Sequence, residues 1–453
     1  MSRRKIMNRI INEKEIDTYK IKDLETIVEN NEHIDKKTFK YSTYKGRSVI
    51  NSKELSEENK LKLRYYQLLL NEVFQIRQPN RNVIINHLLN VAPYLSKYNS
   101  PVIFKFDFSK FFESISIEKV LKKIEMNPQI YTRELVVLSK IFSQFTKTTP
   151  GLGIINSFCE LLGNEFDHEI KIKFNKKLII YERYVDDGIL IFDSPVEEEY
   201  IKESILKIAK EYFGSSISFN TEKTKYIDFS AYIDPKSKEV SFDFLGYCFI
   251  YMINNSGSKF KFGIATTKIE KEKGRIKEIV ESFKQTLNLE LLKIRIDNYY
   301  KRLVYFGATT GNKHVWQVRG ISDSYKEAVK LYTLDDKKFS SKFLNDETKK
   351  LLTGEFFLSI FNETFTNIND FEVQERKIIK RARHTINNYY KNNKFISNLY
   401  KNKAIILNER IGYEKVHLKK VISIVDDSLI KDVDDYNELT KVYLKNIYYI
   451  KKK

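Results

Sequence analysis

Two apolar runs of this sequence end in acidic side chains of the type that binds divalent cations. The run PVIFKFD ends in Asp107, and the run LIIYERYVDDGILIF bends at Asp186, Asp187 and Gly188. An Asp-Gly pair between two β-prone arms is typical of a tight hairpin in which the glycine supplies a positive φ. Taken alone, the second run also fits an ordinary Asp-Gly turn, so the first run decides between the two interpretations.

Three carboxylates brought together would suit phosphoryl transfer. If the strand that ends at Asp107 neighbours the hairpin, the three acids converge, and hard cations such as Mg²⁺ prefer carboxylate oxygens. Two such ions, about 3.5 to 4 Å apart, activate a hydroxyl nucleophile and stabilise the leaving oxygen. We expect Asp107 to bridge both ions, Asp186 to share that task and Asp187 to make weaker or outer contacts. The pairing of the strands is inferred, because spacing along the sequence does not reveal it.

The elements that must position these acids are predicted as an α+β core between two helical parts. Residues 1–100 read as helices with one short basic hairpin over Phe39–Ile50, and β-prone runs around a helix fill residues 101–260. Residues 261–453 repeat apolar side chains at helical spacing, which predicts an all-α part. The two clearest stripes are Ile276, Val280, Phe283, Leu287 and Leu439, Tyr443, Ile447, Ile450.

The composition indicates a folded protein that attracts polyanions. Lys and Arg outnumber Asp and Glu by 79 to 60, for a formal charge of +19, which would hold nucleic acid by counterion release. A Lys-rich and Asn-rich genome would give the same bias, so charge alone leaves both explanations open. Cys159 and Cys248 are the only cysteines, which excludes a disulfide framework and a Cys-based zinc site. No long apolar run or leader-like segment occurs, so we expect a cytoplasmic protein without a membrane partner.

Further motifs follow the acids in a recognisable order, and together with them this region resembles the palm of a reverse transcriptase. Asp107 corresponds to the first acidic motif, and Tyr184-Val185-Asp186-Asp187 to the YxDD box. The other motifs are Lys45-Gly46-Arg47 with the later Gln67, which resemble the fingers, Ser218–Thr224 (SFNTEKT), and Phe244-Leu245-Gly246-Tyr247, which resembles the primer grip. The resemblance covers roughly Thr38 to Ile250.

The resemblance implies an α+β fold of right-hand polymerase type, with fingers in residues 1–100, a palm in 101–260 and a mostly α-helical, thumb-like C-terminal domain in 261–453. It implies that Asp107, Asp186 and Asp187 are the catalytic, Mg²⁺-binding residues. It also implies a group of nucleotide-binding residues, Lys45, Arg47, Phe108, Phe112 and Lys223, and a primer grip made of Phe244, Leu245, Gly246 and Tyr247. Phe112 stands where this family sets an aromatic ring against the sugar, which excludes a 2′-hydroxyl. For the basic residues the plain alternative is solvated loop charge, and for the aromatic residues it is core packing.

One segment departs from the family pattern. Thr149–Phe158 (TPGLGIINSF) stands where the family has a Gly/Pro-rich turn and a helix that hold the template base and the nucleotide, but Ile154 and Ile155 intrude before Asn156-Ser157. Leu162–Asp167 still resembles the far end of that helix. The departure from the family pattern therefore concerns the segment that handles the template.

Among reverse-transcriptase relatives, the DFSKFFESI run and the long Lys-rich helical tail resemble the bacterial abortive-infection and defence-associated group. That resemblance implies a DNA polymerase that adds dNTPs to a nucleic-acid or protein primer in anti-phage defence, with or without a template such as a non-coding RNA. A conventional RNA-templated reverse transcriptase of retron or intron type, and a catalytically silent nucleic-acid-binding protein, stay open as alternatives.

The tail offers surfaces rather than a second catalytic centre. Its basic runs Lys377–Arg383 and Tyr389–Lys394 fit a nucleic-acid surface, a self-association surface of a homo-oligomer or a solvated helix face. The acids Asp432, Asp434 and Asp435 precede a helical stripe, where we expect them to cap the helix. The six histidines are scattered without metal-ligand spacing, and no phosphate-cradling GxxxxGK[ST] loop occurs.

Overall fold

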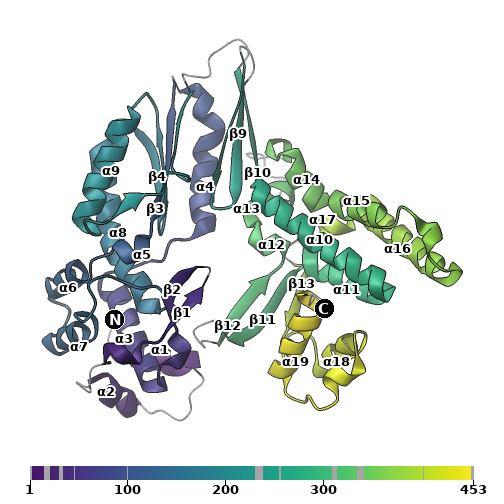
Figure 1. Ribbon diagram of the computed structural model, residues 1–453, viewed down its shortest axis with the longest axis horizontal. Helices are drawn as coiled ribbons and strands as arrows, with labels where there is room; N and C mark the ends of the chain where they lie inside the picture. Colours follow the sequence, from purple (N-terminus) through teal and green to yellow (C-terminus); the bar gives the residue numbers. More distant parts are fainter. Residues whose placement is uncertain are drawn as a thin grey trace. The chain divides into compact units, whose positions relative to one another are not determined.

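The structure is a computed structural model of the chain, drawn in Figure 1. It describes residues 3–14, 21–29, 34–44, 46–98, 100–229, 238–254, 257–308, 314–333, 341–400 and 402–449. Two compact units divide the chain: the first lies within Met1–Pro235, and the second begins at Lys236 and includes His314–Lys453. No helix of the described part is both long and apolar enough to cross a membrane.

The first unit is an α+β structure around a five-stranded sheet. The sheet has the order β4-β5-β3-β6, and β7 also pairs with β3. Its strands are β3 (Val102–Ser109), β4 (Leu178–Tyr184), β5 (Asp187–Phe192), β6 (Ser218–Phe219) and β7 (Lys225–Asp228). A separate hairpin joins β1 (Tyr41–Tyr44) to β2 (Arg47–Ile50), as the alternation around Gly46 predicted. The helices are α1 (Arg3–Lys14), α2 (Ile21–Glu29), α3 (Glu57–Val73), α4 (Arg81–Val91), α5 (Phe111–Ser114), α6 (Ile117–Glu125), α7 (Thr132–Phe142), α8 (Gly153–Phe174) and α9 (Glu198–Tyr212).

Strand β3 is the centre of this unit. Six of its eight side chains are buried, and buried strands of this kind read as continuous apolar runs. It pairs antiparallel with β5 from Val102↔Phe192 to Asp107↔Asp187. The sequence left this pairing open. In the structure, the strand that ends in the first acid lies beside the hairpin that carries the other two acids.

The second unit combines a β-meander, a small sheet and many helices. The meander has the order β10-β9-β8 and the small sheet the order β12-β11-β13. Its strands are β8 (Lys238–Phe244), β9 (Tyr247–Asn254), β10 (Gly257–Ile264), β11 (Arg302–Ala308), β12 (His314–Arg319) and β13 (Ala404–Leu407). Its helices are α10 (Thr266–Thr286), α11 (Leu289–Tyr300), α12 (Ile321–Ser324), α13 (Lys326–Thr333), α14 (Asp346–Thr353), α15 (Glu355–Thr364), α16 (Val373–Lys391), α17 (Lys394–Asn398), α18 (Lys415–Ser423) and α19 (Tyr436–Tyr443).

The prediction of an all-α C-terminal part was wrong in one respect. Strands β11, β12 and β13 form a sheet inside it, and β11 pairs in parallel with β13 about a hundred positions later in the sequence. Leu303 and Tyr305 of β11 pack into the same core as Leu439 and Tyr443 of α19. The short β13 run was missed because four apolar residues can belong to a strand or a helix, and only the distant partner decides.

The predicted helical stripes bury the expected side chains. Ile276, Val280 and Phe283 lie in the core on α10, whereas Leu287 ends that helix with a φ of +48°. Leu439, Tyr443 and Ile447 are buried over α19 and the following π-helical turn, and Ile450 lies outside the described residues. At the start of α19, Asp435 caps the helix by accepting from the Glu438 N–H, as predicted, whereas Asp434 pairs with Lys415 and Lys419 instead.

Candidate active site

Asp107, Asp186 and Asp187 meet at one end of the β3-β5 pair. Asp107 stands directly opposite Asp187 in the ladder, so both belong to adjacent strands at the same register. Asp186 lies in the two-residue connection between β4 and β5, where its carbonyl accepts from the Phe108 N–H at 3.1 Å. Asp107 is only 4% exposed, while Asp186 and Asp187 are half-buried. Two strand ends and one turn therefore gather three carboxylates from two distant parts of the sequence.

The turn that carries Asp186 differs from the predicted one. Val185, not Gly188, has the positive φ, at +59°, although β-branched residues adopt this conformation only at a cost of about 1 to 2 kcal/mol. Gly188 lies in β5 opposite Phe106, and a Cβ at this position would come within 2.1 Å of the Phe106 ring. Glycine is thus required here by the close approach of a ring, and the surrounding structure holds Val185 in the strained conformation.

A buried arginine forms a hydrogen bond with the backbone of this turn. The Arg183 side chain, 2% exposed, donates to Glu160 at 2.8 Å and to Asp167 at 2.7 Å, both on α8. Its Nη1 also donates to the Val185 carbonyl at 2.8 Å. A Cβ on Gly163 would come within 2.3 Å of the guanidinium, so this glycine of α8 leaves the space that the arginine fills. We call Arg183, Glu160, Asp167 and Gly163 the arginine clamp.

Burial, together with the crowding of negative charge, raises the pKa of two of the three acids. Burial and the neighbouring Asp107 raise the pKa of Asp186, while Lys223 and Arg47 oppose the shift. Burial, Asp186 and Asp107 raise the pKa of Asp187 to about 7, against the opposing charge of Lys105. Like charges in a partly desolvated site disfavour joint ionisation. A cation bound among them would relieve that repulsion.

The donor chemistry of these acids fits a divalent cation. Carboxylate oxygens are the ligands that Mg²⁺ prefers, and the three acids offer them on adjoining strand ends. As the side chains lie, no group of three or more His, Cys, Asp or Glu residues in the described ranges forms a ready metal cluster. Instead, the Lys223 ammonium donates to Asp107 Oδ2 at 3.0 Å. The site thus has the required donors, with one donor oxygen engaged by an ammonium group.

Lys223 reaches Asp107 because the SFNTEKT segment is folded against β3. The Asn220 N–H donates to the Asp107 carbonyl at 2.7 Å, and the Asn220 carbonyl accepts from the N–H groups of Lys223 and Thr224. This turn directs the lysine toward the acids, and its side chain stays about half exposed, at 53%. Lys223 is therefore near the carboxylates and also accessible to a ligand.

The fingers hairpin and the departing TPGLGIINSF segment are tied together. The Ile50 N–H donates to the Pro150 carbonyl at 2.7 Å, and Gly151, with φ +121°, leaves no room for a Cβ against the Ile50 backbone. Gln67 of α3 donates to the Gly153 carbonyl at 2.9 Å. Although its sequence departs from the family pattern, the segment thus joins the hairpin and α3 to the first residue of α8.

The hairpin carries a basic residue, Arg47, among the described residues. Arg47 is exposed, and its charge is close enough to oppose the rise in the pKa of Asp186. Lys45 lies outside the described residues. The hairpin therefore brings at least one cation toward the three acids.

The aromatic residues after Asp107 divide into core and surface. Phe108 is 2% exposed, and its ring stacks on Phe219 at 5.6 Å and on Phe111 at 5.9 Å. Neighbouring rings therefore cover its side chain, and its role in nucleotide binding stays a prediction. Phe112 is half-buried, so its ring retains a face for a ligand. Its carbonyl accepts from the Thr148 hydroxyl, which links it to the segment before α8.

The FLGY residues form the β8-β9 hairpin in the second unit. Phe244 is 1% exposed and Tyr247 is fully buried, where the Tyr247 ring stacks on Phe262 at 5.1 Å. Both side chains thus belong to the core, which was the plain alternative, and the primer grip stays a prediction. Leu245 and Gly246 form the turn, with φ values of +49° and +78°, and these two residues are half-buried.

Sequence reasoning missed the arginine clamp and Lys105. Both had a signal in the sequence: Lys105 interrupts the apolar run before Asp107, and Arg183 stands beside Glu182 in the β-prone run before Asp186, where a buried charge requires a partner. Glu160 and Asp167 are seven residues apart, about two turns, which sets them on one face of a helix. The pairing of that face with Arg183 depends on tertiary structure.

Comparison with known proteins gives one family match. The family model described as reverse transcriptase (RNA-dependent DNA polymerase) matches residues 18–249, about half of the chain. This match includes β3, the hairpin with its acids, and the FLGY turn.

Several solved structures of telomerase are similar at low identity. Telomerase from Candida albicans in complex with the TWJ fragment of telomeric RNA is 13% identical with a TM-score of 0.39, over 94% of this chain and 68% of that chain. Apo telomerase from Candida tropicalis is 12% identical with a TM-score of 0.36, over 91% and 70%. A form of it truncated from the C-terminal domain is 13% identical with a TM-score of 0.32, and this chain spans only 54% of its length.

Proposed function

The chain belongs to the reverse transcriptase (RNA-dependent DNA polymerase) family, and from this membership we propose that it extends a primer with deoxynucleotides, using Asp107, Asp186 and Asp187 as its metal-binding acids. The observation that carries the proposal is the register of β3 and β5, in which Asp107 stands opposite Asp187 and Asp186 lies in the adjoining turn. Because these acids come from two distant segments, their meeting is a property of the fold and not of a local turn.

The proposed reaction is attack of a primer hydroxyl on the α-phosphate of a dNTP, with release of pyrophosphate. Reverse transcriptases use divalent metal ions, and two Mg²⁺ ions, when bound, would lower the pKa of the attacking hydroxyl and stabilise the leaving oxygen. Asp107, Asp186 and Asp187 would hold these ions through their carboxylates. The arginine clamp keeps Asp186 in place, since Arg183 fixes the carbonyl of the preceding residue.

The residues around the acids supply the nucleotide's other contacts. Lys223 donates to Asp107 at 3.0 Å and is half exposed, so its ammonium can turn to the phosphates of the nucleotide. Arg47 on the fingers hairpin offers a second, fork-shaped cation for the triphosphate. Phe112 retains a free face, which supports its proposed role against a 2′-hydroxyl. Ordering these groups around one nucleotide supplies much of the catalysis in phosphoryl transfer.

The direct test is Asp186→Asn, with Asp346→Asn as the control for the same change at an exposed acid. We expect no dNTP incorporation with Asp186→Asn, because a metal ligand is lost, and an unchanged melting temperature. The control should incorporate normally, since Asp346 is 86% exposed on α14. Incorporation by Asp186→Asn at the wild-type rate would exclude the metal assignment. A wild-type protein that binds nucleic acid but never incorporates would support the silent binding protein instead.

We propose a role in anti-phage defence, which rests on the sequence resemblance of the DFSKFFESI run and the helical tail. A reaction with all four dNTPs, Mg²⁺ and no added template separates untemplated synthesis from copying of an RNA. Product that appears only with a primed RNA, and matches its sequence, would favour the conventional RNA-templated enzyme.

A further inference from the structure

Helix α16 presents a band of basic side chains along its exposed face. At 3.6 residues per turn, six of its side chains fall within an arc of roughly 100°. All six are exposed, and the opposite face buries Ile379, Ala382, Ile386 and Tyr389. We call the exposed set the α16 stripe: Lys377, Lys380, Arg381, His384, Asn388 and Lys391.

The cations of the stripe have no acidic partner among the described residues. Lys377, Lys380, Arg381 and Lys391 form no ion pair there. The acids at the start of α16, Glu372 and Glu375, form a capping box instead. The two other arginines of the helix are engaged with backbone carbonyls and lie beside the stripe: Arg376 donates to the Phe371 carbonyl and Arg383 to the Phe365 carbonyl.

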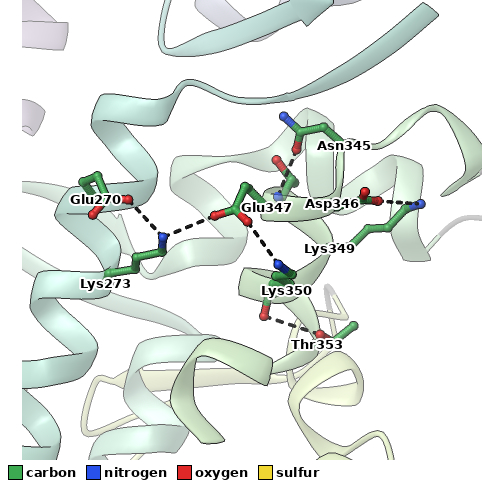
Figure 2. A network of polar contacts seen from close by, with 9 residues as sticks. Glu270, Lys273, Asn345, Asp346, Glu347, Lys349, Lys350 and Thr353 are labelled. Atoms are coloured by element: carbon green, nitrogen blue, oxygen red, sulfur yellow. Dashed lines mark hydrogen bonds and ion pairs between the residues drawn. The ribbon is translucent and has the colours of Figure 1, made fainter. Parts of the chain in front are cut away.

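Other lysines of the same unit are paired, as Figure 2 shows for α10 and α14. Lys273 of α10 lies 3.0 Å from Glu270 and 3.2 Å from Glu347, and Lys350 lies 3.3 Å from Glu347. Lys349 pairs with Asp346 at 3.9 Å. These lysines lie beside acids, whereas the four cations of the α16 stripe share one helix face without an acidic partner among the described residues.

Unpaired like charges destabilise a helix. Lys377 lies three residues before Lys380 and four before Arg381, and like-charge pairs at these spacings cost about 0.2 to 0.5 kcal/mol each. From Lys377 to Lys391 the stripe is about 21 Å long at 1.5 Å per residue. One nucleic-acid strand presents about six phosphates over this length, at roughly 3.4 Å per charge. A phosphodiester backbone would therefore match the stripe in length and in sign, and it would remove the repulsion.

We propose that the α16 stripe binds the sugar-phosphate backbone of a nucleic acid. The proposal depends on the proposed function only for the identity of that strand, which would be a primer, template or product. The stripe combines one arginine with several lysines, which contact phosphates, and shows no pattern of side chains that would recognise bases. We therefore expect binding that is insensitive to the nucleotide sequence. Such binding is governed by counterion release, so its signature is the dependence of affinity on salt.

The test compares two triple variants that remove the same charge from the same unit. The stripe variant is K377Q/K380Q/R381Q, and the control is K273Q/K349Q/K350Q, which removes the paired lysines of Figure 2. Binding of a labelled RNA–DNA duplex of about 20 base pairs, and of a single-stranded RNA, is measured between about 50 and 200 mM salt. Vesicles rich in phosphatidylserine serve as a second polyanion.

Each phosphate contact on a duplex contributes about 0.9 to the slope of log affinity against log salt. For the duplex, we therefore expect the slope to become smaller by about 2.7 in the stripe variant, which loses three such contacts. Over that salt range the wild type would then lose about 40-fold more affinity than the variant. For single-stranded RNA the slope should shrink by about 2.1. The control should keep the wild-type slope in both cases.

Two results would overturn the proposal. Equal slopes for the stripe variant and the control would mean that α16 is only a solvated face. Loss of vesicle binding with an unchanged nucleic-acid slope would identify a membrane surface. The proposed function is judged separately: the stripe variant should still add a nucleotide at saturating primer, whereas Asp186→Asn should bind with the wild-type slope and add none.

Discussion

Replacing Arg183 with methionine tests whether the arginine clamp holds the turn that carries Asp186. Arg183 is 2% exposed and pairs with Glu160, itself 4% exposed, and with Asp167 at 2.7 Å. Removing one partner of a buried ion pair leaves an uncompensated charge and costs about 3 to 5 kcal/mol. At about 2 to 4 °C per kcal/mol for a unit of this size, we expect the melting temperature to fall by roughly 6 to 20 °C.

The pH dependence of this loss follows from Glu160. Burial raises the pKa of Glu160, and Arg183 is the largest opposing influence. Without the arginine the pKa rises further. A carboxyl whose folded pKa lies above its unfolded value contributes stability at pH below the unfolded value, and this contribution is lost as pH rises through the folded value. The melting temperature of Arg183→Met should therefore fall further below that of the wild type at pH 8 than at pH 5.

A compensated variant separates stability from positioning. In R183M/E160M/D167N no buried charge lacks a partner, so most of the lost stability should return. The Val185 carbonyl still lacks its donor, and a displacement of about 1 Å near the reacting atoms can cost about 100-fold in rate. We expect kcat to stay reduced by about that factor with little change in KM. Calorimetry and steady-state incorporation measure the two effects, and a drop of less than about 2 °C for Arg183→Met would refute the reasoning.

The remaining predictions concern the surroundings of the acids. Gly188→Ala should lower stability by about 1 to 3 kcal/mol by forcing the Phe106 ring aside; in denaturant unfolding the control Gly274→Ala, which meets nothing within 4 Å, should be neutral or stabilising. Phe112→Ala should admit ribonucleotides, and unchanged selectivity between ATP and dATP would remove the gate assignment. Arg47→Ala should raise KM for dNTP about 10-fold, for a loss of about 1.4 kcal/mol, so wild-type kinetics would count against its contact with the triphosphate. Chelation with EDTA should abolish incorporation and added Mg²⁺ should restore it; activity that survives chelation would contradict metal dependence.

The sequence by itself determined the local elements and the residue types at their ends. Apolar runs of the right length predicted β3 and the β4-β5 hairpin, and helical spacing predicted the buried faces of α10 and α19. These features depend on neighbours a few positions away, which the sequence displays directly. The three acids were found because each follows such a run.

Only the tertiary structure decided which strands are neighbours and which side chains are covered. A local rule assigned the positive φ to Gly188, but a ring from β3 requires glycine there and the strain falls on Val185. The resemblance named Phe108 among the nucleotide-binding residues, and aromatic residues from distant segments bury its ring. Arg183 acquires its partners from α8. Each of these outcomes depends on contacts between segments far apart in the chain, and strand register and close packing, rather than local preference, fix those contacts.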